Sequence, residues 1–126
     1  MRIALVDDCP NDLSIMHQFL AEALDTDSVI TEFHNGEDFL QHWSADTFDL
    51  IVLDIYMEQL TGIEIARVIR ETGPNVCLVF ATTSNEFASE SYEVNACYYL
   101  CKPFLKQQVL AMLDRIGQQN LEVSRT

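Results

Sequence analysis

Short apolar runs alternate along the chain with longer stretches in which apolar residues recur at helical spacing. The runs have the length of β-strands and cover residues 3–6, 29–33, 50–53, 76–81 and 97–100. Between them, stripes with intervals of three and four residues predict amphipathic helices. The helical stripes comprise Leu13, Met16, Leu20 and Leu24; Phe39, Leu40 and Trp43; Ile63, Ala66 and Ile69; and Val109, Met112, Leu113 and Ile116. A more polar helix is expected within 85–94, with Phe87 and Tyr92 as its apolar residues.

Residues that start or end helices lie between these elements. Pro10 begins the first helix, Asn35-Gly36 opens the second, and Thr61-Gly62 precedes the third. Gly73-Pro74 ends the third helix. The signals therefore support five successive strand–helix units.

Five such units predict a parallel sheet covered by helices on both faces. The first, third and fourth runs are nearly continuous in aliphatic residues, as expected of central strands. The second run, with Thr31 and Glu32, and the fifth, with Tyr98 and Tyr99, are more polar and suit the edges. We therefore expect a flavodoxin-like (βα)5 three-layer sandwich with strand order 2-1-3-4-5. Its ligand crevice lies at the carboxyl ends of the first and third strands.

Polar residues follow the predicted strands at that edge. Asp7 and Asp8 end the first strand, Asp54 the third and Thr82 the fourth, and Lys102 follows the fifth. Three neighbouring carboxylates repel one another unless a cation neutralises them. An all-oxygen set favours Mg²⁺, and a lysine with a hydroxyl adds partners for an anion. Together these groups predict a site for a phosphoryl group.

Charge narrows the classes of partner. The 126-residue chain has a net charge of −13, which excludes direct binding of this segment to a nucleic acid backbone. DNA could be reached only through another domain. The apolar start at 3–6 is too short for a signal peptide, and no run is long enough to cross a membrane, so we expect no membrane contact and a cytoplasmic location.

The cysteines at positions 9, 77, 97 and 101 form no CxxC pair. Along a strand, Cys97 and Cys101 would lie about 13 Å apart, too far to share one zinc ion. We expect all four to be reduced, small apolar residues. Cys9 follows the acidic pair, and its role is left open.

These residues, in this order and spacing, resemble the receiver domains of two-component response regulators over about residues 2–117. The likeness rests on Asp7-Asp8, Asp54, Gly62, Thr82, Tyr99 and Lys102-Pro103. The stretch from Thr82 to Phe104 is most similar to receivers that precede a LytTR-type DNA-binding domain. The resemblance also implies that the Lys102-Pro103 peptide bond is cis, which proline makes accessible.

The resemblance implies a phosphoacceptor role for Asp54, with the phosphoryl group coming from a sensor histidine kinase. Asp8 and Asp54 would bind Mg²⁺ directly, Asp7 would act through water, and the Tyr56 backbone carbonyl would complete the site. The domain would catalyse only its own phosphorylation and dephosphorylation. The bulky Tyr56 side chain would overhang the phosphoryl group and shield it from water.

The resemblance also implies a switch. Thr82 and Lys102 would hold the phosphoryl oxygens, and Tyr99 would move inward as Thr82 moves. The surface formed by the fourth helix, fifth strand and fifth helix would change and could form a homodimer contact. We expect residues 1–120 to form the receiver and the polar tail 121–126 to begin a linker to an output domain that controls transcription.

Two other functions compete with this one. A phosphatase of the haloacid dehalogenase type would use Asp54 as its nucleophile, but it needs a second aspartate where this chain has Tyr56. An adaptor that binds partners without taking phosphate is disfavoured by the complete acidic set. A dinucleotide-binding domain lacks its glycine pattern after the first strand.

Overall fold

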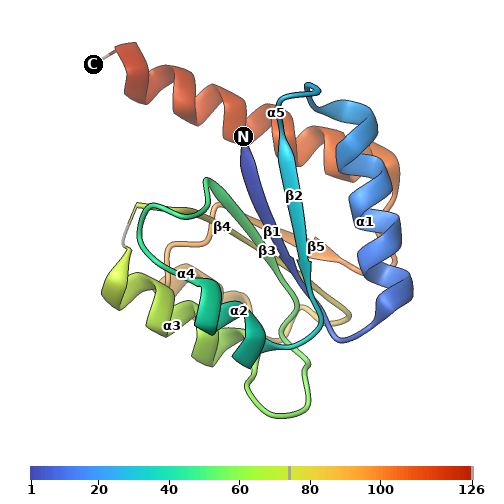
Figure 1. Ribbon diagram of the computed structural model, residues 1–126, viewed down its shortest axis with the longest axis vertical. Helices are drawn as coiled ribbons and strands as arrows, with labels where there is room; N and C mark the ends of the chain where they lie inside the picture. The colour runs from blue at the N-terminus through green and yellow to red at the C-terminus, as the bar shows by residue number, and fades with distance from the viewer. Residues whose placement is uncertain (74, 126) are drawn as a thin grey trace.

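The computed structural model describes residues 1–73 and 75–125, and the side chains of the last helix up to residue 117. Strands and helices alternate along the chain (Figure 1). Their bounds are β1 (Arg2–Val6), α1 (Pro10–Ala23), β2 (Val29–Phe33), α2 (Gly36–His42), β3 (Leu50–Leu53), α3 (Gly62–Thr72), β4 (Cys77–Thr82), α4 (Ala88–Glu93), β5 (Tyr98–Cys101) and α5 (Lys106–Arg125).

The strands form one parallel sheet in the order β2-β1-β3-β4-β5, which confirms the predicted topology. In Figure 1, α1 and α5 cover one face, and α2, α3 and α4 cover the other. Val6 at the end of β1 pairs with both Phe33 and Leu53, and Thr82 at the end of β4 pairs with Cys101. All five strands therefore end at the same edge of the sheet.

Each face of the sheet has its own apolar core, because successive strand residues point to opposite faces. Ile51 and Leu53 pack on the side of α2 and α3, whereas Leu50 and Val52 pack on the side of α1 and α5. All four residues of β3 are buried, while β2 is mostly exposed. This contrast confirms the assignment of central and edge strands.

The residues expected at the starts of α2 and α3 cap these helices. The Asn35 side chain accepts a hydrogen bond from the Asp38 N–H at 2.8 Å, and the Thr61 hydroxyl accepts one from the Glu64 N–H at 3.2 Å. Such caps satisfy backbone donors that the first turn leaves unpaired. They fix the loops that lead from β2 and β3 into the next helices.

The fourth and fifth units differ in detail from the prediction. Helix α4 has six residues, and Tyr92 is 85 % exposed because Ser91 and Val94 face the core instead. Phe87 does pack against that core. Strands β4 and β5 each begin and end one residue later than expected, which makes Thr82 the last residue of β4.

Helix α5 continues through the predicted tail as far as Arg125, and Thr126 lies outside the described residues. The division at residue 120 therefore falls inside a helix, and it stays a prediction. None of the helices in the described ranges, 1–73 and 75–125, is long and apolar enough to cross a membrane.

Candidate functional site

The ends of β1 and β3 bring the predicted carboxylates together. The Asp54 N–H donates to the Val6 carbonyl at 2.9 Å, which extends the pairing of β3 with β1 by one residue. Asp54 therefore lies beside Asp7 and Asp8, which follow Val6 directly. Carboxylate oxygens of these three aspartates lie within 4.8 Å of one another. The structure thus assembles the acidic set that the sequence predicted.

Burial makes this cluster electrostatically unfavourable. Asp7 and Asp54 are 7 % and 5 % exposed, while Asp8 is exposed to solvent. Burial, followed by the charge of Asp7, raises the pKa of Asp54 to about 7, and Asp8 adds to the effect. The Lys102 charge and a hydrogen bond from the Tyr56 N–H oppose this rise. Asp54 is therefore an acid whose charge needs a counterion.

Lys102, directly after β5, is the counterion of the buried aspartates. Its Nζ atom lies 2.7 Å from Asp7, 2.9 Å from Asp12 and 3.6 Å from Asp54, and its side chain is only 9 % exposed. Burial alone would lower the pKa of Lys102, but the hydrogen bonds to Asp7 and Asp12 outweigh it and raise the pKa. The ammonium group is thus fixed as a cation.

Asp12 is a member of the site that the sequence did not single out. It lies in the first turn of α1, where an acidic residue is commonly explained by the helix dipole. The turn places its carboxylate over the end of β1, beside Lys102. The signal in the sequence is its position in the first turn of the helix that follows Asp7-Asp8.

The charge balance of these residues fits a divalent cation. Asp7, Asp12 and Asp54 lie within 4 Å of the Lys102 ammonium group, and Asp8 adds a fourth carboxylate to the cluster. Ligands of an octahedral Mg²⁺ ion lie about 3 to 4 Å apart, which is compatible with the spacing of the three clustered oxygens. The donors are all oxygen atoms, as a hard cation prefers. The site can therefore hold Mg²⁺.

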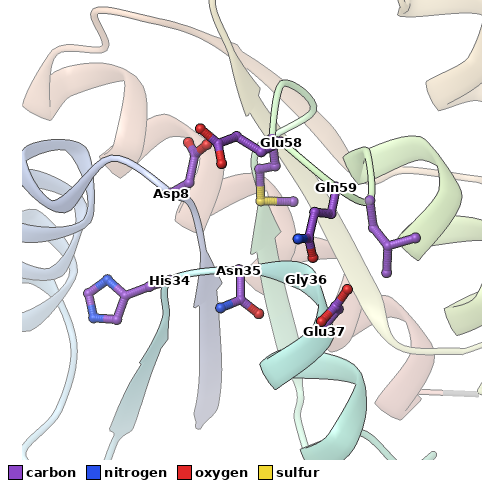
Figure 2. Close-up of a pocket in the computed structure, with 9 residues that line it drawn as sticks. Asp8, His34, Asn35, Gly36, Glu37, Glu58 and Gln59 are labelled. Atoms are coloured by element: carbon purple, nitrogen blue, oxygen red, sulfur yellow. The ribbon is translucent and has the colours of Figure 1, made fainter.

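A surface groove reaches the cluster beside Asp8. It has a volume of about 430 Å³ and lies between the loops that follow β1, β2 and β3. Figure 2 shows the carboxylates of Asp8 and Glu58 near one another at one end of the groove, and Glu37 at the other. Solvent and a hydrated cation can therefore approach Asp8 from this side.

Thr82 supplies a hydroxyl group without a partner. Its side chain is fully buried, and its Oγ1 atom has no hydrogen-bond partner among the described residues. Its carbonyl accepts from the Lys102 N–H at 2.7 Å, which joins the end of β4 to the residue after β5. A buried, unpaired hydroxyl costs free energy, so this group is ready to donate to an incoming anion.

Gly62 explains how α3 can start so close to Asp54. A Cβ atom at position 62 would lie 2.2 Å from the Asp54 carbonyl oxygen and 2.8 Å from the Ile55 Cα. Both are backbone atoms, so a change of side-chain rotamer cannot relieve the clash. The Gly62 N–H also donates to the Ile55 carbonyl at 2.9 Å. Glycine thus fixes the loop that carries Asp54 and Tyr56.

Two tyrosines contact the loop between β4 and α4. The Tyr56 hydroxyl donates to Glu86, and its ring lies edge-on against Phe87 with 5.4 Å between centroids. The Tyr99 hydroxyl donates to the Ser84 carbonyl. These two contacts hold the loop that follows Thr82 from both sides.

The Lys102-Pro103 peptide bond, which follows β5, is cis, as expected.

Comparison with known proteins decides the family. The model of the response regulator receiver domain matches residues 3–114. The chain belongs to the response regulator receiver domain family. It is therefore the receiver domain of a two-component response regulator, and domains of this family act as regulatory switches.

Relatives of this receiver support the expected class. The sensory transduction protein LytR of Staphylococcus epidermidis is 34 % identical over 119 residues, which cover 92 % of this chain and 46 % of that protein. The chain thus spans about half the length of this relative. Its similarity to LytR proteins confirms the resemblance to receivers of the LytTR class.

Solved structures support the same fold. The BeF3-activated receiver domain of DrrB, a Thermotoga maritima regulator, is 32 % identical, with a TM-score of 0.80 over 93 % of this chain and 97 % of that one. TrrA from Thermotoga maritima, solved in complex with Mg²⁺ and a beryllium fluoride, is 30 % identical, with a TM-score of 0.73 over 88 % and 97 %.

Proposed function

We propose that Asp54 of this receiver accepts a phosphoryl group from the phosphohistidine of a sensor histidine kinase in an Mg²⁺-dependent reaction. One observation carries the proposal. Buried Asp54 lies among other carboxylates, 3.6 Å from the Lys102 ammonium, and a buried Thr82 hydroxyl without a partner ends the neighbouring strand. The charges of this set suit a cation on one side of Asp54 and an anion on the other.

The acidic residues have separate roles in this proposal. Asp8 and Asp54 would bind Mg²⁺ directly, Asp7 would act through water, and the Tyr56 carbonyl would complete the set. When bound, the ion offsets the charge of the carboxylates and of the incoming phosphoryl group. Asp7 is already oriented, because it accepts from the Cys9 N–H at 2.9 Å and from Lys102. A bound cation would also favour the ionised, nucleophilic form of Asp54.

Transfer then requires one displacement. An Asp54 carboxylate oxygen attacks phosphorus, the bond from phosphorus to the histidine nitrogen breaks, and that nitrogen keeps the electron pair. The product is an acyl phosphate on Asp54. Lys102 and the Thr82 hydroxyl bind its oxygens, and these contacts exist only in the phosphorylated state. Such a difference in contacts is what shifts a conformational equilibrium.

The switch follows from the contacts of the β4–α4 loop. Movement of Thr82 toward the phosphoryl group shifts the loop that follows it. In the unphosphorylated structure, the Ser84 carbonyl of this loop accepts a hydrogen bond from the Tyr99 hydroxyl. Tyr99 then moves inward, and the surface of α4, β5 and α5 changes. This surface is the proposed contact for a second copy. In this proposal residues 1–120 are the receiver, and 121–126 begin the linker to a LytTR-type DNA-binding domain that controls transcription.

The proposal is tested by phosphorylation with a small donor. The chain is incubated with acetyl phosphate and Mg²⁺, and its intact mass is recorded. We expect a gain of one phosphoryl group in the wild type and in Asp27→Asn, whose aspartate is exposed and remote from the cluster. Asp54→Asn and a chelated sample should show no gain.

Other outcomes would favour the competing functions. Turnover of a small phosphate ester that depends on Asp54 would indicate a phosphatase. A folded chain that binds Mg²⁺ but takes no phosphoryl group would contradict the phosphoacceptor role and indicate an adaptor.

A further inference from the structure

Two of the four cysteines meet at the edge of the sheet opposite the acidic cluster. Cys77 begins β4, and Cys97 immediately precedes β5. The Cys97 N–H donates to the Leu78 carbonyl at 2.7 Å, and Val79 pairs with Tyr98 in the next position. The bond from the Cys97 N–H places Cys97 beside Leu78 and therefore near Cys77, the preceding residue of β4.

The backbones of the two cysteines are spaced as in a disulfide, and Cys97 lies before β5, outside the regular alternation of side chains between the two faces of the sheet. Adjacent strands about 4.8 Å apart, with a rise of about 3.3 Å for the one-residue offset, separate the two Cα atoms by about 6 Å. Disulfides span Cα separations of about 4.4 to 6.8 Å. The two thiols already meet, because the Cys77 thiol hydrogen-bonds to the Cys97 sulfur. Little backbone movement is therefore needed to join them.

The surroundings of the pair favour a reactive thiolate. The hydrogen bond from Cys77 lowers the pKa of Cys97 to about 6, against the effect of burial, and raises the pKa of Cys77 itself. The Arg70 charge also favours the Cys97 thiolate. Its guanidinium group donates to the Val76 carbonyl at 2.7 Å and to the Asn95 carbonyl at 3.1 Å. Val76 directly precedes Cys77 in the sequence, and Asn95 lies two residues before Cys97.

A small oxidant can reach the pair. Cys77 and Cys97 are both partly exposed. Cys97 also lines a surface hollow of about 340 Å³, together with Tyr92, Asn95 and Arg115. Cys101, by comparison, donates its thiol hydrogen to Asn85 at 2.8 Å. Reactivity should therefore concentrate at Cys97.

We propose that Cys77 and Cys97 form a redox-active pair that a peroxide closes into an intrachain disulfide. The Cys97 thiolate attacks one peroxide oxygen, the O–O bond breaks, and a sulfenic acid and hydroxide form. The Cys77 thiol then attacks the sulfenic sulfur and releases water. The two sulfurs lose two electrons in total, and the peroxide gains them. The bond joins the start of β4 to the start of β5 and encloses residues 77–97, which include Thr82 and α4.

Two double variants test this proposal. In Cys9→Ser/Cys101→Ser only the proposed pair remains, and in Cys77→Ser/Cys97→Ser only the other two cysteines remain. After treatment with hydrogen peroxide, the first should lose two hydrogens in its intact mass, and dithiothreitol should restore them. The second should show no such loss. Circular dichroism confirms that both variants are folded.

A second measurement does not depend on oxidation. At pH 7 we expect iodoacetamide to alkylate Cys97 roughly tenfold faster than Cys101, because a thiol with a lowered pKa is mostly thiolate. The proposed disulfide is contradicted if Cys9→Ser/Cys101→Ser loses no hydrogens or gains only oxygen. It is also contradicted if Cys77→Ser/Cys97→Ser shows the same loss of two hydrogens. Equal alkylation rates would contradict the reactive Cys97. Since the pair lies away from Asp54, neither result depends on phosphoryl transfer.

Discussion

The two ends of the sheet hold charges in different ways. At the carboxyl ends of the strands, Asp7, Asp54 and Lys102 are nearly buried, and acidic groups outnumber the single cation. At the amino ends, Arg2 pairs with Asp49 at 3.3 Å, and both side chains are about half exposed. The first arrangement is costly without a ligand, whereas the second is balanced and solvated. The difference indicates that the carboxyl ends of the strands are the ion-binding end of the sheet.

We expect the largest effect from substitution of Gly62 at the start of α3. Gly73, at the end of the same helix, is the comparison. Gly62→Ala would place a methyl group against backbone atoms of Asp54 and Ile55, so we expect a loss of at least about 3 kcal/mol in unfolding free energy. Gly73→Ala, near the amino ends, would meet the Trp43 ring at 2.7 Å and the Ala45 Cα at 3.2 Å. It should cost less, because the ring can move and the contact with the backbone is looser than at Gly62. Urea denaturation measures both, and equal losses would contradict the role given to Gly62.

Removing one cation at each end should separate the two kinds of ion pair. Lys102→Met leaves buried Asp7 and Asp54 without their counterion, and we expect it to lower the free energy of unfolding by about 3 kcal/mol without Mg²⁺. Arg2→Met breaks an exposed pair and should cost less than about 1 kcal/mol. Thermal and urea denaturation of both variants give the comparison. A larger loss for Arg2→Met would overturn it.

The buried acid should also give stability a dependence on pH. The pKa of Asp54 is raised to about 7 in the folded state, so between about pH 4 and 7 the unfolded chain releases a proton that the folded chain retains. Without Mg²⁺, this group therefore makes the protein less stable as pH rises through that window. Asp54→Asn should flatten this part of the curve, whereas Asp49→Asn should not. Because Mg²⁺ favours ionised Asp54, the affinity of the protein for Mg²⁺ should rise with pH over the same range.

The smallest effect is expected at Tyr56. Tyr56→Phe removes the hydroxyl that bonds to Glu86 but keeps the ring against Phe87, whereas Tyr56→Ala removes both contacts. If the ring shields the acyl phosphate from water, Tyr56→Ala should shorten its lifetime by more than Tyr56→Phe. Loss of phosphate from the isolated phosphorylated chain measures this. Equal lifetimes in the wild type and Tyr56→Ala would exclude shielding by the side chain.

The sequence predicted much of the fold and of the acidic site because both follow from short-range rules. Parallel strands end at one edge, so Asp7, Asp54 and Lys102 could be placed together from their positions after apolar runs. Asp12 was missed because its contact with Lys102 depends on how the first turn of α1 lies over β1. The contact of Cys77 with Cys97 depends on the register of β4 and β5, which the apolar pattern defines only to within a residue.

The most direct test of the account is to fill the site with a phosphoryl mimic and follow the backbone amides by nuclear magnetic resonance. With Mg²⁺ and beryllofluoride, we predict chemical shift changes at Asp8, Asp54, Thr82 and Lys102, and little change at Arg2 near the amino ends. Asp54→Asn should remove the response to beryllofluoride. Shifts that persist in Asp54→Asn, or a wild type whose Thr82 and Lys102 amides do not respond, would contradict the claim that this end of the sheet binds a phosphoryl group on Asp54.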